Sequence, residues 1–231
     1  MGYLRIDKMD AIKDFPNKSD QLAIMNRSMP ENASLFFTQL LKISFNITGE
    51  IYKETALINI KDLLSDKLPK KIQNNVFYQN WIEDMANLCK LFCLMEKSSY
   101  ISYSISSHRG CRRYHIDNVP IRLLVTYAGQ GTEWLPDYFA DKIAYKNGEP
   151  NEKIIKDISA RQFIGEWDIA VFKGGPEGLL HRTPDSALNK NSILMRLDHP
   201  EFWKNIQINF KQNTGYLLNS LKIFKINYIN Q

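Results

Sequence analysis

The chain has 231 residues, of which 44% are hydrophobic and 24% are charged, and its formal net charge is +5. These values are typical of a globular protein that buries its own core, and no apolar run is long enough to span a membrane. The lysines are scattered rather than clustered, so the charge does not indicate a nucleic-acid-binding surface.

The N-terminal third is expected to contribute helices and little sheet. Residues 1–31 are polar and contain Pro16 and Pro30, which predicts a loosely attached N-terminal arm. Three further segments are expected before the core: a helix capped by Asn32 or Ser34, a mixed strand and helix region over 45–60, and a lysine-rich helix over 61–72 interrupted by Pro69.

The clearest helix is predicted over 74–97. Its apolar residues recur at spacings of three and four, which places them on one face. These residues are Phe77, Trp81, Met85, Leu88, Phe92 and Met95. We expect this helix to pack against the outside of a sheet.

Short segments with the two-residue period of β-strands follow this helix. The expected strands are 100–107, 119–127, 154–164, 166–172, 178–184 and 191–198. Such a series predicts an α+β protein whose core is a sandwich or barrel, with a jelly roll among the options. The organisation expected is an arm and helical extension over 1–73, a core over 74–200 and a C-terminal extension over 201–231, within one structural domain.

The three cysteines form an odd set, and the first residues lack the apolar segment of a secretory signal. We therefore expect a cytoplasmic protein with free thiols. Cys89 and Cys93 lie four residues apart beside an apolar stripe, where buried structural thiols are favoured over a metal site. Cys111 is expected to line or underlie a pocket rather than to complete a zinc site with His115.

His115 and Asp117 stand two residues apart at the entrance to an apolar strand. Residues i and i+2 of an extended chain point to the same side, so both side chains could reach one metal ion. His181 is a third candidate ligand, 181 − 117 = 64 residues after Asp117. Two histidines and one carboxylate form the facial triad of non-haem Fe(II) oxygenases, which leaves coordination positions open for chemistry.

Several sequence blocks extend this pattern. They are Cys111 to Asp117, Arg122-Leu123, Thr126-Tyr127, Gly129 to Glu133 and His181 to Pro184. Over about residues 75–200 the chain thereby resembles an uncharacterised bacterial domain family, sometimes encoded near zinc-responsive metallochaperone GTPases. Its signature reads Cys-x-x-Phe/Tyr-His-x-Asp, Arg-Leu, Thr-Tyr-x-Gly-x-Gly-Thr-Glu and His-Arg-Ser/Thr-Pro. More distantly, the triad and its glycine-rich turn resemble the Fe(II)/2-oxoglutarate dioxygenase superfamily.

The distant resemblance implies a double-stranded β-helix (jelly-roll) core with N-terminal helices packed on the outside. It implies Fe(II) held by His115, Asp117 and His181, and 2-oxoglutarate as a cosubstrate in the oxidation or hydroxylation of a small molecule or peptide. The far carboxylate of 2-oxoglutarate requires a cation, and arginine suits it because its planar fork donates two hydrogen bonds.

The candidate anchors for that carboxylate are Arg196 and Arg122, ranked equally, with Lys190 behind them. Tyr127, Thr183 and Tyr114 are candidates for orienting the histidines. The remaining chemistry-bearing residues receive structural interpretations. His108 and His199 are expected at the surface or in turns, and Trp134 and Trp167 in the core.

Two other functional classes remain open. One is a cupin-like metal-binding or ligand-binding protein without catalysis, linked to zinc homeostasis. The other is an interaction protein in which the three candidate ligands are fortuitous. The partner expected is a small-molecule or peptide substrate, with neither nucleic acid nor membrane.

Overall fold

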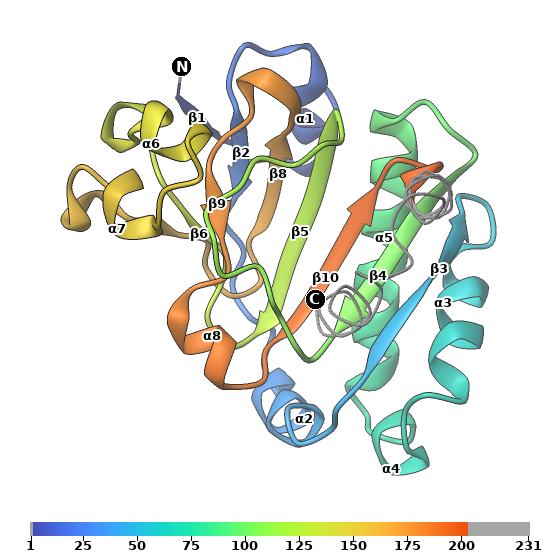
Figure 1. Ribbon diagram of the computed structural model, residues 1–231. Helices are drawn as coiled ribbons and strands as arrows, with labels where there is room; N and C mark the ends of the chain where they lie inside the picture. Colours follow the sequence, from blue (N-terminus) through green and yellow to red (C-terminus); the bar gives the residue numbers. More distant parts are fainter. Residues whose placement is uncertain (1, 203–231) are drawn as a thin grey trace, which may run out of the picture.

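The computed structural model of the chain describes residues 2–202 and contains two β-sheets with helices around them (Figure 1). The large sheet has the order β1-β2-β8-β5-β10-β4-β3 and the small sheet the order β7-β6-β9. All neighbouring strands are antiparallel except β1 and β2. The fold is therefore α+β, as the sequence predicted, and it contains one large, mostly antiparallel sheet.

The large sheet consists of β1 (Tyr3–Arg5), β2 (Leu22–Met25), β3 (Asn46–Tyr52), β4 (Tyr100–Ser106), β5 (Ile121–Ala128), β8 (Ile169–Lys173) and β10 (Ile193–Asp198). The small sheet consists of β6 (Glu133–Trp134), β7 (Gln162–Phe163) and β9 (His181–Arg182). The helices are α1 (Met9–Ile12), α2 (Ala33–Leu40), α3 (Ala56–Ser65), α4 (Lys70–Gln73), α5 (Tyr78–Met95), α6 (Lys142–Lys146), α7 (Asn151–Ile154) and α8 (Asp185–Asn189).

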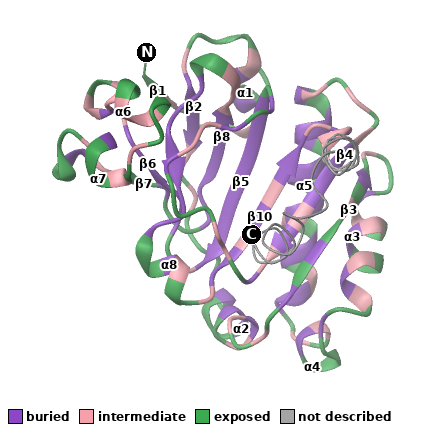
Figure 2. Cartoon of the chain, in the orientation of Figure 1, coloured by how far each residue is buried: buried purple, intermediate pink, exposed green. Residues whose placement is uncertain are grey.

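The main core lies between one face of the large sheet and helices α2, α3 and α5. Trp81 of α5 is fully buried there, and its ring centroid lies 5.4 Å from that of Phe36 and 6.1 Å from that of Tyr127. The long helix expected over 74–97 is confirmed as α5, with its apolar stripe inside. Figure 2 shows the central strand β5 buried along its whole length, because helices cover one face and the small sheet the other.

The alternation of side chains along β5 separates two environments. Leu123, Val125 and Tyr127 enter the main core, whereas Leu124 belongs to a second apolar cluster between the sheets. Arg122 shares the parity of Leu124 and therefore faces the same side. This second side, between the sheets, holds the candidate functional residues.

The N-terminal segment is not a loosely attached arm, and that prediction is wrong. Strand β2 lies inside the large sheet, pairs with β8 from Leu22↔Phe172 to Met25↔Ile169, and is buried over residues 22–24. The polar residues around this short apolar run concealed it, because four residues are too few to establish a period. The expected C-terminal extension over 203–231 lies outside the described residues.

Residues 154–164 were expected to form a strand and mostly do not. Helix α7 ends at Ile154, a 3₁₀ turn covers Ile158–Ala160, and only Gln162–Phe163 pairs in a sheet. Among the described residues, no helix has the length and apolar character needed to cross a membrane.

The raised pKa of Glu96, the residue that follows α5, predicts that the free energy of unfolding depends on pH. Burial raises the pKa of this carboxyl from 4.5 to about 7, the charge of Asp198 adds to the shift, and His199 Nε2 lies 3.9 Å away. The folded chain thus retains a proton that the unfolded chain releases, so its stabilising contribution is lost as pH rises from 4.5 through about 7. Glu96→Gln is expected to remove this loss. The full shift corresponds to about 3.4 kcal/mol, and solvent screening of this partly exposed group reduces the expected gain at pH 8 to about 2 kcal/mol.

Urea unfolding at pH 5 and pH 8 measures the effect. Glu83→Gln is the matched control, because Glu83 is exposed on the same helix and bonded only to Gln79 among the described residues. Equal pH dependence in the wild type and Glu96→Gln would contradict the prediction.

Candidate metal centre

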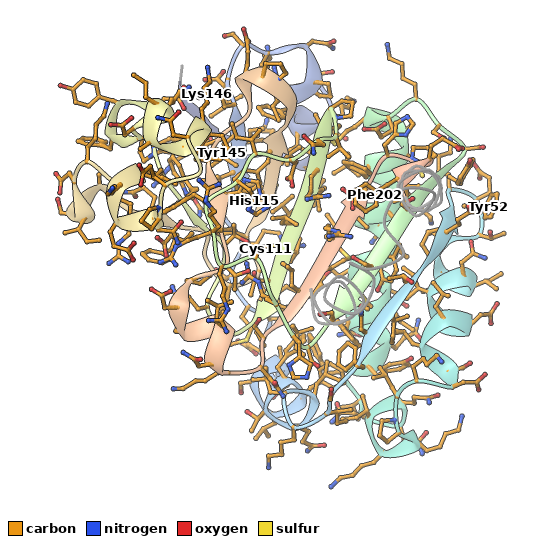
Figure 3. All side chains as sticks on the ribbon, in the orientation of Figure 1. Tyr52, Cys111, His115, Tyr145, Lys146 and Phe202 are labelled. Atoms are coloured by element: carbon orange, nitrogen blue, oxygen red, sulfur yellow. The ribbon has the colours of Figure 1, made fainter. Side chains whose placement is uncertain are left out.

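His115 and His181 face each other across the open end of the small sheet. They form an isolated antiparallel bridge, with N–H···O distances of 3.0 and 3.1 Å, and their ring centroids lie 4.5 Å apart. His115 and Asp117 precede β5, at the entrance to that strand as the sequence predicted, and His115 itself pairs only through this isolated bridge. Figure 3 shows His115 on this connection. One donor atom from each of His115, Asp117 and His181 lies within 4.8 Å of the others.

Glycine holds the backbone of Asp117 in place. The Asp117 carbonyl accepts a hydrogen bond from the Gly175 amide at 2.8 Å. A Cβ at Gly174 would lie 2.4 Å from that carbonyl and 2.1 Å from the carbonyl of Val119. The turn after β8 therefore requires glycine at position 174, because any side chain would push Asp117 out of position.

The hydrogen bonds of the two imidazoles define which nitrogen is available. His115 Nδ1 lies 3.1 Å from the carbonyl of Arg113, and His181 Nδ1 lies 2.9 Å from the carbonyl of Leu179. A carbonyl only accepts, so each Nδ1 carries the proton and each Nε2 keeps a lone pair. These Nε2 atoms lie 3.7 Å and 3.3 Å from the carboxylate oxygens of Asp117.

This arrangement fits a divalent cation. Asp117 Oδ2 is buried and accepts no hydrogen bond from any residue between 2 and 202. Two imidazole lone pairs and a carboxylate would repel one another at these distances, and a bound cation would offset that repulsion. Both histidines have their other ring nitrogen bonded to a carbonyl, as ligating histidines almost always do.

The charge states also suit metal binding. Burial lowers the pKa of His115 to about 4, and the charge of His181 adds to the shift, so His115 is neutral at pH 7. Burial alone would raise the pKa of Asp117, but the charges of His181 and Arg122 outweigh it and hold that pKa well below its usual range. Neutral imidazole and ionised carboxylate are the forms that bind a metal.

Asp117 belongs to a row of ion-paired side chains, Asp117, Arg122, Asp198 and Arg196, which we call the ionic chain. Arg122 donates to Asp117 Oδ1, and its Nε lies 2.6 Å from Asp198 Oδ1. Arg196 Nε lies 2.9 Å from the other oxygen of Asp198. The ring of Phe202 packs against both guanidiniums, 5.3 Å from Arg122 and 4.9 Å from Arg196. Phe202 is labelled in Figure 3 near β10.

The candidate anchors for a cosubstrate therefore occupy different positions. Arg122 and Arg196 both belong to the ionic chain beside the triad, and Arg196 is the more accessible, with 27% of its side chain exposed against 9% for Arg122. Lys190 is exposed at the end of α8. Sequence reasoning missed Asp198, although its spacing of two from Arg196 on one strand was the signal available.

The candidates for orienting the histidines are also separated. Thr183 is buried beyond β9, and its amide donates to the Cys111 carbonyl at 2.9 Å. Tyr127 is not brought to the triad, because it enters the main core and donates to Asp84 Oδ2 at 2.6 Å. Tyr114 donates to the carboxylate of Glu133.

Glu133 connects the segment that carries His115 with the segment that carries His181. It is 1% exposed, accepts from Tyr114 next to His115, and lies 3.0 Å from the guanidinium of Arg182 next to His181. Sequence reasoning placed Glu133 in the family signature without assigning it this contact. The charge pair fixes the spacing of the two segments, because both groups are buried and neither can be left unpaired.

The cysteines and the remaining histidines lie outside the triad. Cys89 and Cys93 are free and buried on α5, as expected, and Cys111 is free and exposed. His108 is exposed and lies 2.8 Å from Ser44 Oγ. His199 lies beyond β10.

Among the solved structures that are similar to this chain are AviO1, a prolyl hydroxylase and a putative oxygenase. AviO1 from Streptomyces viridochromogenes Tue57 has 10% identity and a TM-score of 0.39, over 84% of this chain and 97% of that one. A Trichoplax adhaerens prolyl hydroxylase, in complex with a peptide fragment of hypoxia inducible factor, has 11% identity and a TM-score of 0.41, over 86% and 91%. A putative oxygenase from Shewanella oneidensis has 11% identity and a TM-score of 0.43, over 94% and 100%.

Similarity at this level leaves the activity to be argued from the site itself. No curated protein matches the chain. One family model matches residues 7–198, which include the whole candidate metal centre and nearly all of both sheets. The chain therefore belongs to the family described as Protein of unknown function (DUF1826).

Proposed function

We propose that this protein is a non-haem Fe(II)-dependent oxygenase that uses 2-oxoglutarate to oxidise or hydroxylate a small molecule or peptide. The observation that carries the proposal is the convergence of two imidazole lone pairs and a carboxylate oxygen without a hydrogen-bond donor, all within 4.8 Å. Two histidines and one carboxylate leave room on the metal for a cosubstrate and O₂, whereas structural zinc sites usually fill all four positions with protein ligands.

The path of the chain supports a double-stranded β-helix (jelly-roll) core. From β4 onward the chain alternates between sheets: β4 in the large sheet, the His115 bridge beside the small sheet, β5, then β6 and β7, then β8, β9 and β10. Alternation between two sheets is typical of a jelly roll. Helices α2 to α5 pack on one face of the large sheet, where a jelly roll with outer helices would carry them.

The protein's own part in the reaction is to hold and orient the reactants. Bound at the triad, Fe(II) would supply the O₂ chemistry in which 2-oxoglutarate is decarboxylated to succinate and the substrate is oxidised. His115 and His181 would bind through Nε2 and Asp117 through Oδ2, because Arg122 occupies Oδ1. Arg196 is the better placed anchor for 2-oxoglutarate, since its guanidinium is the more accessible of the two.

Succinate formation tests the proposal. We expect the wild type, given Fe(II), 2-oxoglutarate and O₂, to form succinate slowly even without its substrate, and to stop when any of the three is omitted. His181→Ala should form none, whereas His108→Ala, which removes an exposed histidine, should match the wild type. A wild type that binds metal but neither binds 2-oxoglutarate nor forms succinate would contradict the proposal. A preference for Zn(II) in that case would favour the metal-binding protein without catalysis.

A further inference from the structure

A hollow lies away from the triad, between α7, α8 and the segment that carries Arg112. Its volume is about 480 Å³, within the range of small-molecule sites. Arg182 of β9 lines it, whereas the preceding residue, His181, faces the metal centre. Because successive strand residues point to opposite sides, the hollow lies on the other side of β9 from the triad.

Positive charge predominates in this hollow. Its lining includes the four cations Arg112, Lys156, Arg161 and Arg182 and the two carboxylates Glu152 and Asp185. Arg182 is neutralised, because it donates two hydrogen bonds to Asp185, at 2.8 and 2.9 Å, and pairs with buried Glu133. The three other cations thus face one remaining carboxylate.

Those three cations are weakly compensated by the protein. Within residues 2–202, no carboxylate lies within 4.0 Å of Arg112 or Lys156, and both side chains are exposed. Among the carboxylates of the described residues, Arg161 has only Glu133 within 4.0 Å, at 3.9 Å, and its Nε donates to the carbonyl of Ile158 at 3.2 Å. These guanidiniums and Asp185 line one hollow, and hydrogen bonds from Arg182, with the charges of Arg161 and Arg112, lower the pKa of that carboxyl.

Apart from Asn151, whose amide is polar, the rest of the lining is apolar. Ile155, Ile158 and Leu188 contribute it, and Ile158 is 62% exposed. A phosphate group offers several acceptor oxygens and up to two negative charges to a set of guanidinium and ammonium donors. An organic group attached to that phosphate would cover the apolar side chains. We propose that this hollow binds a small phosphate-bearing organic ligand, independently of the metal centre.

Binding of phenyl phosphate, measured by calorimetry on metal-free protein, tests the proposal, with inorganic phosphate and phenol as partial probes. We expect phenyl phosphate to bind more tightly than either. The double variant Arg112→Gln/Lys156→Gln should weaken phenyl phosphate at least about tenfold. Its control is Lys142→Gln/Lys153→Gln, which removes the same charge from α6 and α7 outside the lining and should bind like the wild type.

Two further variants locate the binding. Arg161→Gln should also weaken phenyl phosphate, and His181→Ala should leave it unchanged, so that a failure of the proposed oxygenase would not affect this result. The proposal is overturned if no saturable binding occurs, if both double variants bind equally, or if His181→Ala abolishes binding. Thermal melting of each variant shows that it is folded at the temperature of the titration.

Discussion

His181→Ala is expected to bind Fe(II) at least about 100-fold more weakly than the wild type, because it removes one of the three donors that converge at the centre. Changes to residues that merely support ligands typically cost 10-fold to 100-fold in metal affinity, and loss of a ligand should cost more. The backbone bridge between positions 115 and 181 uses main-chain atoms and remains available to alanine. Anaerobic equilibrium dialysis against Fe(II), followed by iron analysis, gives the affinity.

His108→Ala is the matched control for this variant. It removes an imidazole that is exposed and bonded to Ser44, so its iron affinity should equal that of the wild type. Far-ultraviolet circular dichroism should show both variants folded. An unchanged affinity in folded His181→Ala would exclude that histidine as a ligand.

Arg122→Ala is expected to give the largest loss of stability among changes near the site. Arg122, Asp117 and Asp198 are 8%, 4% and 1% exposed, and the guanidinium contacts both carboxylates. Its removal leaves two buried carboxylates without their shared cation, which costs about 3 to 5 kcal/mol. Urea unfolding of metal-free protein at pH 7 measures this loss, and Fe(II) affinity should also fall about 10-fold to 100-fold because Asp117 is no longer held.

Two other variants separate geometry from charge. Arg122→Lys keeps the cation but loses the planar fork, so it should lie between the wild type and Arg122→Ala. Arg5→Ala, at an exposed position of β1, controls for the loss of an arginine and should leave stability within about 0.5 kcal/mol. A stability of Arg122→Ala equal to that of Arg5→Ala would show that the buried ionic chain contributes nothing.

The sequence predicted the candidate ligands His115 and Asp117 because their spacing is a local property of the chain. The spacing of His115 and Asp117 implied a common direction, and the structure brings His181 to them. The sequence prediction nevertheless kept Tyr127 as a candidate, although it has the opposite parity to Arg122 on β5 and enters the main core. Applying the parity rule to every candidate would have removed it.

Other features depend on contacts that no local pattern encodes. β2 has only four residues and is recognisable as a strand only through its pairing with β8. The first residue of β8, Ile169, lies 169 − 22 = 147 positions after the first residue of β2, Leu22. Asp198 belongs to the ionic chain because it pairs with Arg122, which lies on the neighbouring strand β5. Long-range pairs of this kind are set by the packing of the two sheets, and a single sequence does not reveal them.

X-ray absorption at the iron edge, on protein loaded anaerobically with one equivalent of Fe(II), tests the central claim most directly. We predict two imidazole nitrogens among the neighbours of iron, with the remaining neighbours oxygen. His115→Ala and His181→Ala should each lose one imidazole. A sulfur neighbour, which would place Cys111 on the metal, or a spectrum unchanged in both variants would contradict the assignment of His115, Asp117 and His181 as the ligands.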